Sequence, residues 1–114
     1  MEARAIRPFI PSIDFEVSKS FYKDLGFTIT YDSSDLVVLS ATGASFFLQN
    51  AYNEVWAQNS MVQLFVDDLD AFYETAVQIN VIYPNTKTKA IINADYGRTF
   101  NIIDPAGVCW HIME

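Results

Sequence analysis

The first 26 residues predict a strand followed by an amphipathic helix. Residues 6–13 are mostly apolar but contain two prolines, which predicts a strand at a sheet edge or one with a bulge. Asp14 suits the N-cap of a helix, and Gly26 suits the left-handed residue that ends it. The apolar side chains between them share one face, at Val17, Phe21, Tyr22 and Leu25.

Three short apolar runs follow this helix, and polar turns separate them. The turns contain the sequences Asp-Ser-Ser-Asp at 32–35 and Thr-Gly at 42–43. The predicted strands are residues 27–31, 36–40 and 45–49. The first half of the chain therefore has the order β-α-β-β-β.

The second half repeats this order after a break at residues 50–60. Residues 62–66 alternate as a strand, and Asp67 or Asp68 then caps a second helix. The apolar face of that helix is Leu69, Phe72, Tyr73, Ala76 and Val77. Three more strands are predicted at residues 86–93, 99–103 and 108–113. We therefore expect one α+β domain made of module one (1–49), a linker (50–60) and module two (61–114).

Strand parity assigns faces to two of the strands in module two, because successive side chains point to opposite sides of a sheet. Val62, Leu64 and Val66 suit the core beneath the helix, which leaves Met61, Gln63 and Phe65 on the other face. On the last strand Val108, Trp110 and Ile112 face the core, and Cys109, His111 and Met113 face away from it.

Composition excludes several classes of function. The net charge of −7 repels phosphate backbones and anionic membranes, so we expect neither nucleic acid nor membrane as a partner. Cationic or neutral ligands are compatible with this charge. No apolar run approaches the ~20 residues of a membrane span, and no signal peptide is visible. The single cysteine, Cys109, cannot form an internal disulfide, which favours a cytoplasmic location.

Two signatures at opposite ends of the chain resemble the glyoxalase/bleomycin resistance/dioxygenase superfamily (vicinal oxygen chelate fold). The first is Ile13-Asp14 followed by Phe21-Tyr22-Lys23-Asp24-Leu25-Gly26-Phe27. The second is Tyr96-Gly97-Arg98-Thr99-Phe100 followed by Asp104-Pro105-Ala106-Gly107. Many bleomycin-resistance-like members have Trp-Gly where this chain has Tyr96-Gly97. The resemblance implies two βαβββ modules around a cupped mixed sheet and, in a chain of this length, a homodimer.

The resemblance also indicates which side chains line the cup. The expected ligand-binding residues are Arg7, Phe9, Phe47, Gln49, Trp56, Met61, Gln63, Phe65, Tyr96, Asn101 and His111. Their aromatic and apolar character suits flat or apolar ligands, and loop aromatics stack on planar or cationic groups.

The family positions that usually carry metal ligands hold unsuitable residues here. The resemblance places Arg7, Phe47 or Gln49, Met61 and His111 at those positions. A divalent ion of this kind is coordinated by several imidazole or carboxylate groups, and the chain has only one histidine. We therefore expect no catalytic metal and no cofactor, and we name no catalytic residue.

Four single residues allow more than one interpretation each. His111 could be a surviving ligand or general base, but a histidine bonded within the sheet or contacting a ligand is the favoured interpretation. Cys109 is favoured as a small buried apolar residue over a nucleophile. Arg7 could hold an anion or lie on the surface, and Trp56 could contact ligand or pack the linker or a dimer interface.

We favour a metal-free binding protein similar to bleomycin-resistance proteins, which sequesters an aromatic or cationic molecule at a dimer cleft. One alternative is a metal-dependent lyase, isomerase, thiol transferase or ring-cleaving dioxygenase with an atypical site. Another is a structural module whose cup is filled by its own side chains. An enzyme is disfavoured because the metal-binding side chains typical of the family are missing. The sequence does not identify the small molecule that is bound.

Overall fold

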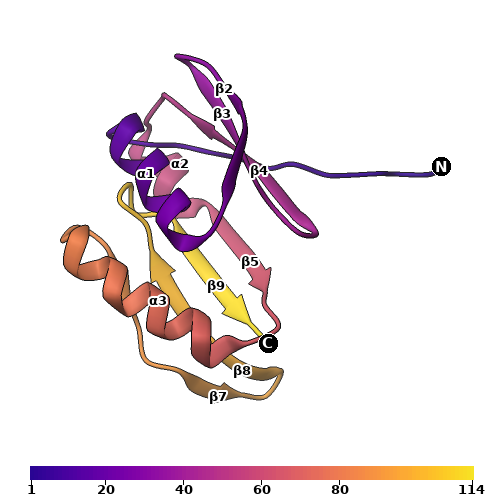
Figure 1. The fold of residues 1–114 in the computed structure, drawn as a ribbon, viewed down its shortest axis with the longest axis vertical. Helices are drawn as coiled ribbons and strands as arrows, with labels where there is room; N and C mark the ends of the chain where they lie inside the picture. Colours follow the sequence, from indigo (N-terminus) through magenta and orange to yellow (C-terminus); the bar gives the residue numbers. More distant parts are fainter.

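The computed structural model describes residues 1–114 and contains two modules, each with a strand, a helix and then further strands (Figure 1). The first comprises β1 (Phe9–Ile10), α1 (Phe15–Leu25), β2 (Thr28–Asp32), β3 (Leu36–Ala41) and β4 (Ala44–Gln49). The helix α2 (Glu54–Asn59) follows it. The second module comprises β5 (Met61–Phe65), α3 (Leu69–Ile82), β6 (Lys87–Thr88), β7 (Ile92–Ala94), β8 (Gly97–Ile103) and β9 (Cys109–Met113). The chain is therefore α+β, as predicted.

Each module forms its own mixed sheet, and the two sheets have equivalent topologies. Sheet A has the strand order β1-β4-β3-β2, with β1 parallel to β4 and the other pairs antiparallel. Sheet B has the order β5-β9-β8-β6, with β7 paired to β8 and β5 parallel to β9. The first strand of each module thus lies beside the last strand of that module.

Side-chain caps set where the two long helices begin. Asp14 Oδ1 accepts a hydrogen bond from the Val17 N–H at 3.2 Å, and α1 ends at Gly26 with a φ of 120°. Asp68 Oδ1 accepts from the Ala71 N–H at 3.0 Å, so Asp68 and not Asp67 caps α3. Local sequence therefore determines both helix starts.

One apolar core serves both modules. In Figure 1, α1 and α3 lie on the same side of the molecule. The two helices are in contact, and buried side chains of α1, α3, β4, β8 and β9 belong to a single cluster. Among its large members, Tyr22 of α1 packs on Trp110 of β9 with ring centroids 5.5 Å apart. The modules therefore pack as one body.

On each of the two long helices, one residue predicted to face the core is exposed. Val17 and Val77 are each 39% exposed, whereas Ser18 and Ile79 are buried. Residues spaced three and four apart share a helix face, so the buried stripe of α1 runs through Phe15, Ser18, Tyr22 and Leu25, and Val17 lies at its edge, one turn before Phe21. The sequence did not indicate this stripe because Ser18, one of its members, is polar.

Three predicted segments also differ from the structure. Only Phe9–Ile10 of residues 6–13 is a strand, and the preceding residues extend away from the body (Figure 1). Prolines in this segment lack the N–H that a longer ladder requires. The linker contains α2, which Asn53 caps through the Trp56 N–H at 3.1 Å. Residues 86–93 form two short strands, β6 and β7, both paired with β8.

None of the helices combines the length and the apolar character that crossing a bilayer requires.

Candidate ligand-binding site

The face of sheet B that points away from the helices carries several of the predicted site residues. Along β5, Met61, Gln63 and Phe65 are exposed, while Val62 and Leu64 are half-buried against the core. The β5–β9 register pairs Gln63 with His111. On β8, Asn101 pairs with His111 from the other side. His111 therefore lies between two amide side chains in the middle of this face.

A cavity of about 310 Å³ opens on this face beside His111. Its lining residues are Met61, Val62, Gln63, Tyr96, His111 and Met113. The structure thus brings together Met61, Gln63, Tyr96 and His111, which the sequence analysis chose from three separate segments. Tyr96 reaches the cavity from the turn between β7 and β8 and is 69% exposed. This cavity combines apolar walls with a few polar groups, which is typical of small-molecule sites.

Sheet A carries a second group of predicted residues. The rings of Phe9 and Phe47 stack with centroids 4.3 Å apart and an interplanar angle of 13°. The guanidinium of Arg7 lies 5.8 Å from the centroid of the Phe47 ring, a cation–π arrangement. Phe9 is 48% exposed, and Gln49 follows Phe47 on the same face of β4. This group offers a flat aromatic surface with a positive charge above it.

The two groups do not share a cavity within one chain, because the cavity on sheet B contains no residue of sheet A. Trp56 belongs to neither group: it lies half-buried on α2, where its carbonyl accepts a hydrogen bond from the Ser60 hydroxyl at 2.7 Å. Phe65 is 65% exposed at the end of β5 and lines a different pocket.

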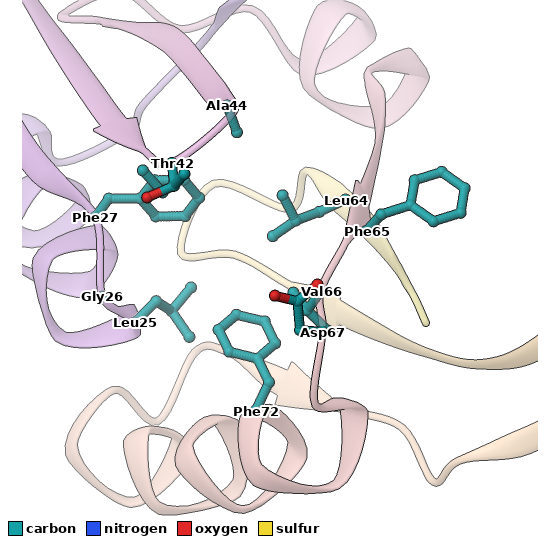
Figure 2. Close-up of a pocket in the computed structure, with 11 residues that line it drawn as sticks. Leu25, Gly26, Phe27, Thr42, Ala44, Leu64, Phe65, Val66, Asp67 and Phe72 are labelled. Atoms are coloured by element: carbon teal, nitrogen blue, oxygen red, sulfur yellow. The ribbon is translucent and has the colours of Figure 1, made fainter.

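That larger pocket, of about 490 Å³, lies where the two modules meet (Figure 2). Leu25, Phe27, Leu64 and Phe72 point into a common space, and the Phe65 ring points away from it. The sequence analysis missed this pocket because its walls come from the end of α1, the β3–β4 turn, the end of β5 and the start of α3. The residue pattern of each segment is typical of a buried core or of a turn, so no local sequence feature indicates the pocket.

No protein-family model matches the sequence, and no curated protein matches it. Solved structures do match. The bleomycin-binding protein of Streptomyces verticillus, complexed with copper(II)-bleomycin, superposes with a TM-score of 0.84 at 20% identity, over 99% of this chain and 97% of that one. A bleomycin resistance determinant encoded on transposon Tn5 gives 0.83 at 22% identity, over 98% of each chain. This chain has the glyoxalase/bleomycin-resistance fold.

The same fold also occurs in an enzyme. Lactoylglutathione lyase from Agrobacterium tumefaciens superposes with a TM-score of 0.69 at 15% identity, over 97% of this chain and 93% of that one. The resemblance expected from the two sequence signatures is therefore confirmed for the fold. Because the fold hosts both binding proteins and enzymes, function has to be argued from the site.

The side chains of this glyoxalase/bleomycin-resistance-fold protein do not form a His and carboxylate metal site. No group of three or more His, Cys, Asp or Glu side chains is arranged to hold a metal ion. At the positions that usually bear ligands, Arg7 stands over an aromatic ring and Met61 lies at the cavity on sheet B. Neither side chain suits a hard or borderline divalent ion.

The only cysteine lies next to the only histidine on β9. Cys109 Sγ is 3.7 Å from His111 Nε2. Burial raises the pKa of the Cys109 thiol, and the positive charge of Lys89 opposes this effect. A raised pKa lowers the thiolate fraction, which disfavours Cys109 as a nucleophile toward organic ligands.

Proposed function

We propose that this protein binds a small aromatic or cationic molecule on the open faces of its sheets and sequesters it without a catalytic divalent metal. The observation that carries the proposal is the grouping of Met61, Gln63, Tyr96 and His111 around one cavity. An exposed aromatic stack on the other sheet adds a second surface of matching character. Large apolar side chains exposed together mark interaction or ligand-binding surfaces.

The partner that completes the site is, we infer, a second copy of the chain. Sheet A and sheet B each offer half of the expected cup, and the cavity at His111 contains neither Phe9 nor Phe47 of the aromatic stack on sheet A. Pairing sheet A of one copy with sheet B of another would enclose a ligand between the Phe9–Phe47 stack and the cavity at His111. It would also cover Met61, Phe65 and Tyr96, which are 68%, 65% and 69% exposed.

The ligand chemistry follows from charge and shape. The net charge of −7 favours cationic over anionic ligands, and exposed aromatic rings stack on planar groups. Two similar structures are described as binding bleomycin or conferring resistance to it, which makes this cationic glycopeptide the first ligand to test. We propose a cytoplasmic location, which suits a free cysteine.

An enzymatic function is the second candidate, because His111 occupies a position where relatives of this fold carry a metal ligand. The lyase that shares the fold motivates this alternative. It would require other His or carboxylate groups to converge on His111, for example from a second copy.

Thermal unfolding of EDTA-treated protein tests the proposal directly. Bleomycin, a flat aromatic cation such as ethidium, and Mn²⁺, Ni²⁺ and Zn²⁺ are each added in excess. A ligand at ~100 times its Kd adds about 2.7 kcal/mol, a shift of several degrees in a domain of this size. A shift with the organic ligands alone supports sequestration, and a shift with divalent metals alone supports the enzyme.

Matched tyrosine variants locate the site. Tyr96→Ala removes an exposed ring at the cavity, while Tyr31→Ala removes a ring that is 54% exposed on β2. We expect the organic-ligand shift to shrink only in Tyr96→Ala. Equal shifts in both variants would place the ligand elsewhere. Sedimentation equilibrium measures the oligomeric state. A protein that is monomeric at ~100 μM would contradict a binding site shared between two copies.

A further inference from the structure

The open face of sheet B carries a charge opposite in sign to that of the whole chain. The chain has 14 acidic and 7 basic residues, yet the strands β5 to β9 contain no Asp or Glu. Lys87 lies on the edge strand β6, and Lys89 follows that strand. The acidic side chains therefore lie outside this sheet, which itself carries only basic charges.

Strand register places both lysines on the face that bears the cavity at His111. Lys87 pairs with Ile103 of β8. Lys89, two residues further on, donates its backbone N–H to the Asn101 carbonyl at 2.9 Å, which continues the same register. Paired residues lie on one face of a sheet, and Asn101 pairs with His111. Lys89, Asn101 and His111 therefore form a row across this face, and Lys87 lies beside the row.

The positive charge of Lys89 acts over this face. It opposes the effect of burial on the pKa of the Cys109 thiol, which belongs to β9. The ion pairs of the chain involve only the cations of Lys19 and Arg98, so Lys87 and Lys89 are unpaired. Two cations without a protein partner are thus available to a ligand on this face.

Screening decides which charges a bound ligand senses. Exposed charges farther apart than the Debye length of ~8 Å in physiological salt are largely screened. Asp70 and Glu74 belong to α3, on the other side of the sheet. Asp95 lies in the turn where β8 begins, whereas Lys87 pairs with Ile103 where β8 ends. The net charge of −7 therefore governs attraction at a distance, and the two lysines govern contact.

We propose that the preferred ligand of this face is a planar aromatic acid, whose carboxylate contacts Lys87 and Lys89 while its ring occupies the cavity. The inference rests on the proposed function and specifies the class of ligand that the site binds. β6 lies two strands from β9, roughly 10 Å at ~4.8 Å per strand, a span that a two-ring acid and an extended lysine bridge. Asn101, whose amide makes no hydrogen bond in the structure, lies between them as a further donor. Arg7 places a positive charge on the other half of the expected cup.

Three probes of similar shape and different charge test the inference. 2-Naphthoate is anionic, 2-naphthamide is neutral, and 2-naphthylmethylammonium is cationic. Each is titrated into the isotopically labelled full chain and followed by NMR, which also shows whether the protein is folded. We expect 2-naphthoate to bind about threefold to tenfold more tightly than 2-naphthamide, since charge-assisted hydrogen bonds are roughly twice as strong as neutral ones. This advantage should shrink in about 0.5 M NaCl.

Single-charge variants locate the group that binds the acid. Lys87→Gln and Lys89→Gln each remove one positive charge from the face, and Lys23→Gln removes one from an exposed position on α1. We expect the preference for 2-naphthoate over 2-naphthamide to fall about twofold to fivefold in each of the first two variants and to disappear when both are combined. Lys23→Gln should keep the full preference, because it changes the net charge equally but leaves the face unchanged.

Each contrary outcome has a distinct meaning. Equal or tighter binding of 2-naphthylmethylammonium than of 2-naphthoate would overturn this inference and leave sequestration in place. A full preference for the acid in the combined variant would do the same. Failure of all three probes to bind would overturn the proposed function, and this inference with it.

Discussion

The Tyr22 hydroxyl donates a hydrogen bond of 2.5 Å to Asp104 Oδ2, across 82 positions of the sequence. Both side chains are fully buried. The other carboxylate oxygen, Asp104 Oδ1, accepts from the Ala106 and Val108 N–H groups, each at 2.8 Å. Trp110 Nε1 donates to the Tyr22 oxygen at 2.8 Å. This network joins α1 of module one to the β8–β9 turn of module two.

Tyr22→Phe should destabilise the protein by about 1–3 kcal/mol, because it leaves the buried Asp104 Oδ2 and the Trp110 N–H without a partner. Urea unfolding followed by tryptophan fluorescence measures the change. Tyr31→Phe is the matched control, since the exposed Tyr31 hydroxyl makes no hydrogen bond in the structure. Equal stability of Tyr22→Phe and Tyr31→Phe would mean that the network contributes nothing.

Asp14→Ala should cost about 0.5–2 kcal/mol, because the carboxylate caps α1 through the Val17 N–H. Asp68→Ala should cost a similar amount at the start of α3. Asp67→Ala provides the control, because Asp67 lies next to a cap residue and caps no helix. Thermal or urea unfolding of the three variants gives the comparison. A loss in Asp67→Ala equal to that in Asp68→Ala would show that charge, not capping, is responsible.

The pair Tyr83 and Asp24 should make stability fall at alkaline pH. The Tyr83 hydroxyl donates to Asp24 Oδ2 at 2.7 Å. Burial, with a further contribution from Asp24, raises the pKa of Tyr83 from 10.0 to about 12. Between these values the folded protein keeps a proton that the unfolded chain releases, so this stabilisation is complete below pH 10 and decreases as pH rises toward 12.

Tyr83→Phe removes this titration. The difference in urea midpoint between pH 9 and pH 11.5 should therefore be smaller in Tyr83→Phe than in the wild type, while Tyr31→Phe should behave as the wild type does. The pKa of the buried Tyr22 is also raised, by burial and by Asp104. Every variant that retains Tyr22 should therefore still lose some stability at alkaline pH. If the difference in urea midpoint between the two pH values is the same in Tyr83→Phe as in the wild type, the hydrogen bond from Tyr83 to Asp24 is not a source of the pH dependence.

Phe47→Ala should weaken binding of an aromatic or cationic ligand about threefold to tenfold, because it removes the partner of both the Phe9 stack and Arg7. Phe65→Ala should also weaken binding if a second copy covers the end of β5. Isothermal titration with the ligand identified by thermal shift measures both effects, and Tyr31→Ala is the control. Unchanged affinity in both variants would remove the site from these two sheets.

Features that depend on neighbouring residues were predictable from the sequence. Asp14, Gly26 and Asp68 act on backbone groups within four residues of themselves, so the limits of α1 and the start of α3 follow from local chemistry. The alternation on β5 and β9 likewise follows from strand geometry once one face is buried. The fold was recognisable from two signatures at opposite ends of the chain, and the repeated order of elements supported the resemblance.

Tertiary packing determined what local signals could not. Ser18 is buried because the α1 stripe meets the sheets there, and Thr86 to Asn93 forms two strands because β8 offers two separate pairing segments. The Tyr22–Asp104 bond and the pocket between the modules join residues distant in sequence. The sequence by itself determined the order of elements and the chemistry of the sheet faces. Only the tertiary structure decided which of those side chains meet, because contacts between distant segments depend on how whole elements pack.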